Sequence, residues 1–149
     1  MGSANFLGVT SKRSKILRNY AHSDLVRQVF PDITAGEEIV CSINVEEMGF
    51  SYQKGYAILI ELTNDDFPTF GEIVEIVVWD QKKIIYSALE TNTYESRLNA
   101  YEVEASEPTV YNAVTIDNLP SKHPLPPSLK YGSKVYVILT YHCRTEVLG

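Results

Sequence analysis

The sequence predicts a mainly β protein, an antiparallel β-barrel or sandwich of about seven or eight strands with one short N-terminal helix. Short apolar runs, typical of strands, recur along most of the 149 residues and are separated by polar, turn-rich connections. These connections are too short for the helical crossovers that parallel strands need. The sheet is therefore expected to be antiparallel and to close into a barrel or fold into two packed layers.

Residues 1–19 are predicted to be a flexible basic arm, followed by a single β domain over residues 20–149. The arm is polar and offers little apolar surface to offset the entropy of ordering. Its first three residues, Met1-Gly2-Ser3, have the form of an expression scar, in which case the chain is a fragment of a larger protein. Its basic cluster is typical of a solvated tail, a nuclear address or a nucleic-acid contact, and consists of Lys12, Arg13, Lys15 and Arg18.

One helix of about two turns is expected near residues 23–30. A serine–aspartate pair can cap its start, and Pro31 ends it. Its apolar face consists of Leu25, Val26 and Val29. A helix this short is not stable alone in water, so it is expected to dock on another part of the fold.

The expected strands are apolar or alternating runs bounded by turn residues, at 38–45, 56–62, 70–79, 84–90, 100–106, 109–116 and 134–143. In the strand at 70–79, strict alternation puts Ile73, Val77 and Trp79 on one face and Val74, Ile76 and Val78 on the other. A strand with one wet face would alternate polar and apolar residues more cleanly. Both faces are therefore expected to be covered, one of them by the helix, another sheet or a second chain.

The net charge of −6 and the pI of about 5.0 argue against nucleic-acid binding by the whole domain, which would need a basic stripe. No apolar run approaches the roughly 20 residues that span a bilayer, so no membrane partner is expected. Cys41 and Cys143 lack CxxC spacing and are expected to be free thiols, which favours an intracellular, reducing compartment. No histidine or cysteine pair has metal-ligand spacing, and no metal or other cofactor is expected.

A group of aromatic residues beside two carboxylates is the candidate ligand-binding site. Aromatic rings arranged around a cation, with a carboxylate nearby, can hold a methylated ammonium group. Aromatic residues are enriched in strands that bind nothing, so core or half-exposed strand positions are the preferred interpretation of the same residues. The candidates are Asp65, Asp66, Phe67, Phe70, Trp79, Tyr86 and Tyr94.

Two resemblances add to this interpretation. Gly55, the apolar run at 56–62, an acidic-aromatic loop and the spacing Gly71-x-Ile73-x-x-Ile76 resemble small chromatin-reader barrels of the bromo-adjacent homology and Tudor-like type. A longer segment is similar to a C-terminal domain of uncharacterised, transposable-element-derived animal proteins, through Phe70-Gly71-Glu72-Ile73, Trp79-Asp80, Leu89-Glu90-Thr91, 98–103 and Tyr136-Val137-Ile138. That resemblance implies a globular accessory domain in a nuclear setting and brings no catalytic residues with it.

The expected function is therefore a non-catalytic interaction domain that binds a protein or peptide, or assembles with itself, within a larger protein. Three further functions stay open. They are a methyl-lysine reader that uses the aromatic group, a nucleic-acid-binding accessory domain that uses the basic arm, and a divergent hydrolase with Cys143 and His123 as a pair. No residue is assigned a catalytic role.

Overall fold

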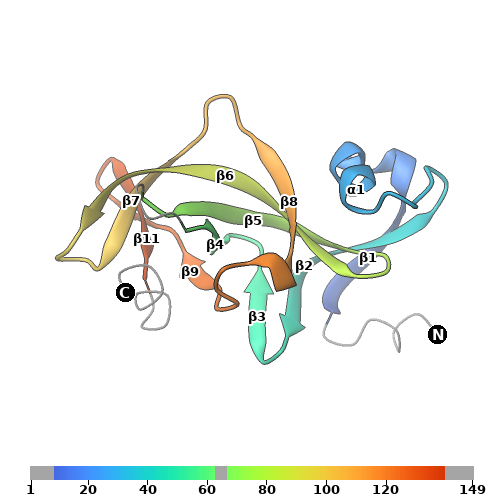
Figure 1. Ribbon diagram of the computed structural model, residues 1–149, viewed down its shortest axis with the longest axis horizontal. Coiled ribbons are helices and arrows are strands. Elements are labelled where there is room, and N and C mark those ends of the chain that lie inside the picture. Colours follow the sequence, from blue (N-terminus) through green and yellow to red (C-terminus); the bar gives the residue numbers. More distant parts are fainter. Residues whose placement is uncertain (1–8, 63–66, 140–149) are drawn as a thin grey trace.

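The structure is a computed structural model that describes the backbone of residues 9–62 and 67–139, and the side chains of all of these except residues 9–11. The predicted fold class is confirmed, since the chain forms a curled antiparallel sheet, a half-barrel, with one α-helix (Figure 1). The described residues contain eleven strands, more than predicted, because several are too short or too polar to stand out in the sequence.

The strands are β1 (Val9–Ile16), β2 (Glu38–Glu47), β3 (Phe50–Gln53), β4 (Tyr56–Glu61), β5 (Thr69–Val78), β6 (Lys82–Glu95), β7 (Ala100–Ala105), β8 (Tyr111–Thr115), β9 (Leu125–Pro127), β10 (Leu129–Tyr131) and β11 (Lys134–Ile138). The helices are α1 (Ser23–Val29) and two single 3-10 turns, η2 (Leu17–Asn19) and η3 (Ile116–Asn118). The α-helix lies where the sequence predicts it, although His22 takes the capping position and no side chain caps its start. Among the described residues, no helix has the length and apolar character that a membrane span requires.

A long ribbon made of β5 and β6 forms the centre of the sheet, whose strand order is β1-β2-β5-β6-β7-β11-β10. At one end of the ribbon, β2 pairs with the end of β5 and β8 with the start of β6. At the other end, β4 pairs with the start of β5 and β7 with the end of β6. Figure 1 shows α1 and β1 at the first end and β7 and β11 at the second.

Both faces of the ribbon are covered near α1, as the apolar character of both faces predicts. On one face, Val77 and Ile85 share a hydrophobic cluster with Val26 of α1, and Leu25 and Val29 pack against its edge. On the opposite face, Ile76 and Ile84 lie in a second cluster that includes residues of β3 and η3. The ribbon's other end encloses a third cluster, which consists of Ala57, Leu59, Phe70, Leu89, Tyr101, Val103, Leu125, Val137 and Leu139.

The predicted assignment of the β5 side chains to two faces is wrong between Ile73 and Glu75, because the strand contains a β-bulge there. Ile73 pairs with Tyr86 and Glu75 with Ile85, so one step on β6 corresponds to two on β5. The extra residue reverses the alternation. Ile73 and Ile76 therefore lie on the same face, and Val77 lies on the face toward α1.

Over residues 9–19 the predicted basic arm forms a strand and a 3-10 turn, while residues 1–8 lie outside the described residues. Residues 9–16 form β1, which runs antiparallel to β2 from Val9 opposite Val45 to Ile16 opposite Glu38. Leu17 follows in η2 with a fully buried side chain, and its backbone N–H donates to the carbonyl of Glu37 at 2.9 Å. Backbone pairing and this one buried leucine offset the entropy of ordering that favours a mobile arm.

Candidate functional site

The structure divides the predicted aromatic group between the two ends of the β5–β6 ribbon. Phe67, Phe70 and Tyr94 all pack against Tyr101, with ring centroids at 5.7, 5.7 and 5.1 Å from its ring. Phe70 and Tyr101 are buried and Tyr94 is half-buried against them, so these three rings belong to the hydrophobic cluster at this end of the sheet. Asp65 and Asp66 lie outside the described residues.

Trp79 lies near the other end of the ribbon, at the turn between β5 and β6. Its ring meets Phe30 edge-on at 5.3 Å, and its Nε1–H donates to Glu37 Oε1 at 3.3 Å. The side chain is half-buried against the α1 cluster. These contacts give Trp79 a packing role that joins the turn to the residues after α1.

Tyr86 is a packing residue whose ring lies over Gly71. A Cβ at position 71 would overlap the ring, so the ring's approach requires glycine there. Tyr86 is 8% exposed, and burial raises the pKa of its hydroxyl above the usual value for tyrosine.

Of the five predicted rings, Phe67 has the most exposed side chain, at 46%. It lines a hollow of about 400 Å³ with residues of β5 and β6, and among the described residues it is the only aromatic side chain in that lining. A cage for a methylated ammonium needs several rings facing one cation. The described residues do not bring the predicted rings together in that way.

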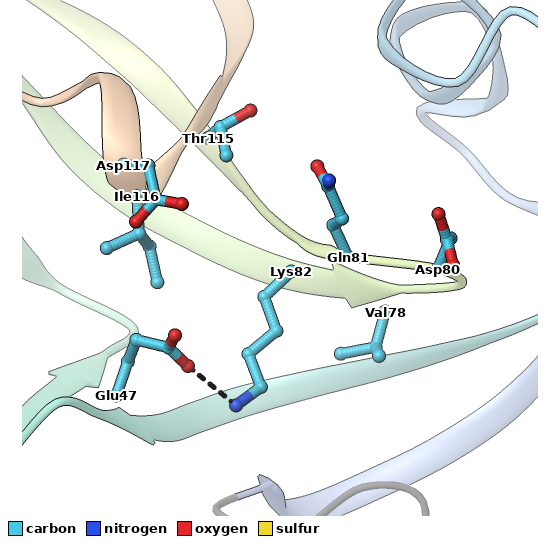
Figure 2. Close-up of a pocket in the computed structure, with 8 residues that line it drawn as sticks. All are labelled: Glu47, Val78, Asp80, Gln81, Lys82, Thr115, Ile116 and Asp117. Atoms are coloured by element: carbon cyan, nitrogen blue, oxygen red, sulfur yellow. Dashed lines mark hydrogen bonds and ion pairs between the residues drawn. The ribbon is translucent and has the colours of Figure 1, made fainter.

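A polar groove lies beside the β5–β6 turn, with a volume of about 270 Å³ (Figure 2). Val78 and Ile116, 6% and 3% exposed, contribute apolar surface to it. The other lining residues are Glu47, Asp80, Gln81, Lys82, Thr115 and Asp117. The carboxylates could accept hydrogen bonds from a cationic or hydroxyl-bearing group.

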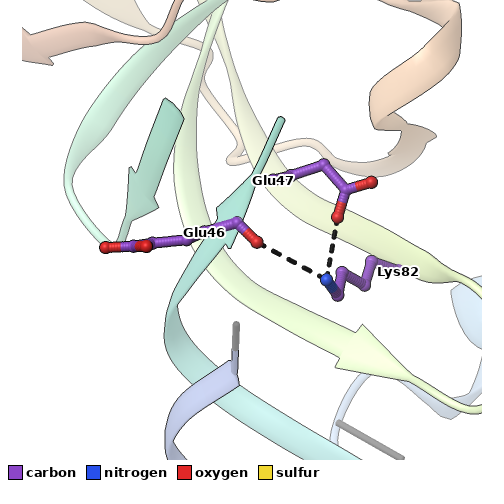
Figure 3. A network of polar contacts seen from close by, with 3 residues as sticks. All are labelled: Glu46, Glu47 and Lys82. Atoms are coloured by element: carbon purple, nitrogen blue, oxygen red, sulfur yellow. Dashed lines mark hydrogen bonds and ion pairs between the residues drawn. The ribbon is translucent and has the colours of Figure 1, made fainter. Parts of the chain in front are cut away.

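An ion pair lies within this groove and joins the end of β2 to the start of β6. Figure 3 shows Lys82 Nζ donating to Glu47 Oε1 at 2.8 Å and to the carbonyl oxygen of Glu46 at 3.5 Å. Both side chains are partly buried. The sequence alone does not reveal this pair, because the strand pairing that brings Lys82 close to Glu47 is not visible locally.

The residues considered for catalysis are placed only in part. His123 packs against Phe50 at 5.0 Å between ring centroids, and its Nδ1 is 2.9 Å from the carbonyl oxygen of Pro124. His142 and Cys143 lie outside the described residues, so the Cys143–His123 pairing stays a prediction. Cys41 is a free, buried cysteine, and burial raises the pKa of its thiol to about 12. A buried thiol that stays protonated at neutral pH is a poor nucleophile.

The four predicted basic residues are brought together along one edge of the sheet. Lys12, Arg13 and Lys15 lie on β1 and Arg18 on η2. Arg13 and Lys15 lie opposite Cys41 and Ile39, on the α1 face, whereas Lys12 lies opposite Ser42 and points to the other face. The side chains of Lys12, Arg13 and Arg18 are exposed. Cations therefore lie on both faces of this edge.

A partly buried hydrogen bond joins Tyr20, just after η2, to Glu75 of β5. Tyr20, 5% exposed, donates its hydroxyl to Glu75 Oε1 at 2.6 Å. Burial is the main cause that raises the pKa of Tyr20 far above its usual value, with the Glu75 carboxylate adding to it, so the hydroxyl remains a donor. Lys15 Nζ lies 6.0 Å from the centroid of the Tyr20 ring, at the limit of a cation–π contact.

In its described residues, the chain has no group of three or more histidine, cysteine, aspartate or glutamate side chains arranged to hold a metal ion. Comparisons with family models, with curated proteins and with solved structures found no match to this chain.

Proposed function

We propose that this chain is a non-catalytic interaction domain that binds an extended segment of another protein by strand addition to β1. The observation that carries the proposal is the position of β1 at the end of the sheet order. Over the described residues, this strand pairs with β2 on one side, and no described strand pairs with its other side. An unpaired edge offers backbone N–H and C=O groups that an incoming strand can use.

The edge is long and held in place, which favours binding. β1 has eight residues, whereas β10, at the opposite end of the sheet order, has three. Leu17 anchors its end in the core. A pre-formed edge lowers the ordering cost that the complex must offset.

A methyl-lysine reader and a hydrolase have less support. The predicted aromatic residues mostly pack inside the fold, and the described residues bring no cysteine and histidine together as a reacting pair. The resemblance to a transposable-element-derived domain supports a larger parent protein in a nuclear, intracellular setting, and we include that setting in the proposal. Localisation of the tagged parent protein by fluorescence microscopy tests it, and a purely extracellular signal contradicts it.

Proline substitutions at two neighbouring positions of β1 test the proposed binding mode. Along an edge strand, successive backbone N–H groups point alternately inward and outward. Of Arg13→Pro and Ser14→Pro, one therefore removes an outward donor, and the other breaks the pairing with β2. The probe is a fluorescein-labelled peptide of about twelve residues that repeats Thr-Glu-Glu-Val, with a second peptide that repeats Thr-Gln-Gln-Val.

We expect one proline variant to keep its unfolding free energy close to that of the wild type and yet lose binding to the peptides. The other variant should be clearly less stable. Fluorescence anisotropy measures the binding, and urea denaturation measures the stability. If the stable variant binds like the wild type, strand addition at β1 is wrong.

A further inference from the structure

We infer that the segment taken up by β1 is acidic, with carboxylates at neighbouring positions that meet the cations on both faces of the edge. This inference rests on the proposed strand addition and specifies the chemistry of the partner. It depends on how charge is distributed in the chain, on the face to which each basic side chain points, and on what surrounds the edge.

Charge is strongly segregated in this molecule. The segment from Lys12 to Arg18 contains four basic residues and no acidic residue. The rest of the chain contains nine of the 13 basic residues and all 19 acidic residues. The edge is therefore a local cationic strip on an acidic protein, and it attracts the opposite charge.

An added strand would meet a cation on each of its two faces. Lys12 points to one face, and Arg13 and Lys15 point to the other. Directly opposed residues on antiparallel strands have Cβ atoms about 4.5–5.5 Å apart, and pairs of opposite charge there are favourable. Because alternate side chains of the partner point to opposite faces, neighbouring acidic residues in it would satisfy both faces.

A second copy of this chain is a poor occupant of the same edge. Antiparallel pairing of β1 with another β1 would set lysine and arginine side chains against one another. Like charges directly opposed across strands are destabilising, and lysine on an edge strand is a common means of preventing self-pairing. The charge pattern therefore selects a foreign, acidic strand.

A nucleic acid is also a poorer fit than an acidic strand. Carboxylates lie at both ends of the strip, because Ile16 pairs with exposed Glu38 and the end of β2 near Val9 carries exposed Glu46. Glu37, also exposed, lies at the same end as Glu38. A duplex contacts a protein over a broad surface and would bring its phosphates close to these carboxylates. A single extended peptide can contact the edge alone.

The experiment compares the Thr-Glu-Glu-Val peptide with its Thr-Gln-Gln-Val counterpart in binding to the full chain. We expect the acidic peptide to bind roughly threefold to a hundredfold more tightly, as charge pairs with Lys12, Arg13 and the half-buried Lys15 would give. The preference should shrink as salt is raised, because screening shortens the range of exposed charges. The double substitution Lys12→Gln/Arg13→Gln should weaken binding of the acidic peptide roughly twofold to thirtyfold, with little effect on the neutral peptide.

The matched control is Arg97→Gln/Lys130→Gln, which removes the same charge from exposed positions at the β7 and β10 end of the sheet, away from β1. It should bind the acidic peptide as the wild type does. Lys15 is left unchanged in both variants because it lies beside the Tyr20 ring and could alter stability. Urea denaturation of all variants checks that the fold is intact.

The outcomes separate this inference from the function on which it rests. Equal binding of both peptides, with loss in the stable proline variant, overturns the acidic partner and leaves strand addition standing. Equal weakening by the two glutamine doubles also overturns the inference, because it shows a net-charge effect. Tighter binding of labelled single-stranded or duplex DNA than of the acidic peptide, lost in Lys12→Gln/Arg13→Gln, would replace the partner with a nucleic acid. Absence of binding by either peptide overturns both proposals.

Discussion

Two aromatic residues at opposite ends of β5 differ in burial. Phe70, at the start of the strand, is fully buried and contacts Tyr101. Trp79, just beyond the end of the strand, is only half-buried against Phe30 and hydrogen-bonded to the exposed Glu37. Both residues are large aromatics in one hairpin. The first lies within the hydrophobic cluster of β4, β7 and β11, and the second joins a turn to the segment after α1. The difference shows that a large aromatic side chain of one hairpin can either fill the core or hold a surface turn in place, depending on how far the sheet curls around it.

Phe70→Ala should produce the largest loss of stability. Removing a fully buried aromatic leaves a cavity in the barrel interior and should lower the unfolding free energy by about 3–5 kcal/mol. Urea denaturation followed by far-UV circular dichroism measures the change. A loss no greater than that of Trp79→Ala would contradict the contrast between the two ends.

Trp79→Ala should cost less, about 1–3 kcal/mol, because part of the side chain already faces solvent. Chemical denaturation measures this value alongside the binding of the acidic peptide. The peptide affinity should not change, since the Trp79 contacts lie within the domain. A stable variant that loses binding would instead make Trp79 part of a recognition surface.

Gly71→Ala tests the close contact with the Tyr86 ring and should cost about 1–3 kcal/mol, because the added methyl group forces the ring to move. The double variant Gly71→Ala/Tyr86→Ala removes the ring that causes the overlap. The cost of Gly71→Ala should therefore be smaller when measured in a Tyr86→Ala background. Additive costs would show that the ring does not demand the glycine.

Tyr20→Phe should have the smallest effect at neutral pH, about 1 kcal/mol, because it removes one hydrogen bond to Glu75. At high pH the stability advantage of the wild type over Tyr20→Phe should shrink. The folded pKa of Tyr20 is raised, so its contribution is complete below the unfolded pKa of about 10 and is lost as pH rises above that value. The wild type should therefore lose stability more steeply between about pH 10 and 11 than Tyr20→Phe does. Parallel slopes in the two proteins would contradict this.

The central strands could be predicted from sequence because their burial leaves a strong apolar signal. β1 could not, since Lys12, Arg13 and Ser14 are exposed and its pairing comes from the backbone of β2. The bulge at Val74 was also hidden, because it depends on the register with β6.

The candidate sites show a similar limit. The basic cluster was visible as residues, but only the strand pairing shows that it lines an edge and faces both ways. The sequence also identifies the aromatic residues, but it does not show that the fold separates them. Phe70 and Trp79 are nine positions apart along and just beyond β5, which allows a separation of at most about 30 Å. The Glu47–Lys82 ion pair depends on contact between strands that are distant in sequence.

The β5–β6 ribbon belongs to the hydrophobic clusters at both ends of the molecule, with Phe70 and Leu89 in one and Val77 and Ile85 in another. The two ends therefore share their covalent and hydrogen-bonded framework. Heat or denaturant cannot melt the barrel end completely while the strands beneath α1 remain paired, unless the ribbon parts midway along its length. Cooperativity in this chain follows from the shared β5–β6 hairpin, and a binding event at the edge of β1 would raise the melting temperature of the distant half-barrel as well.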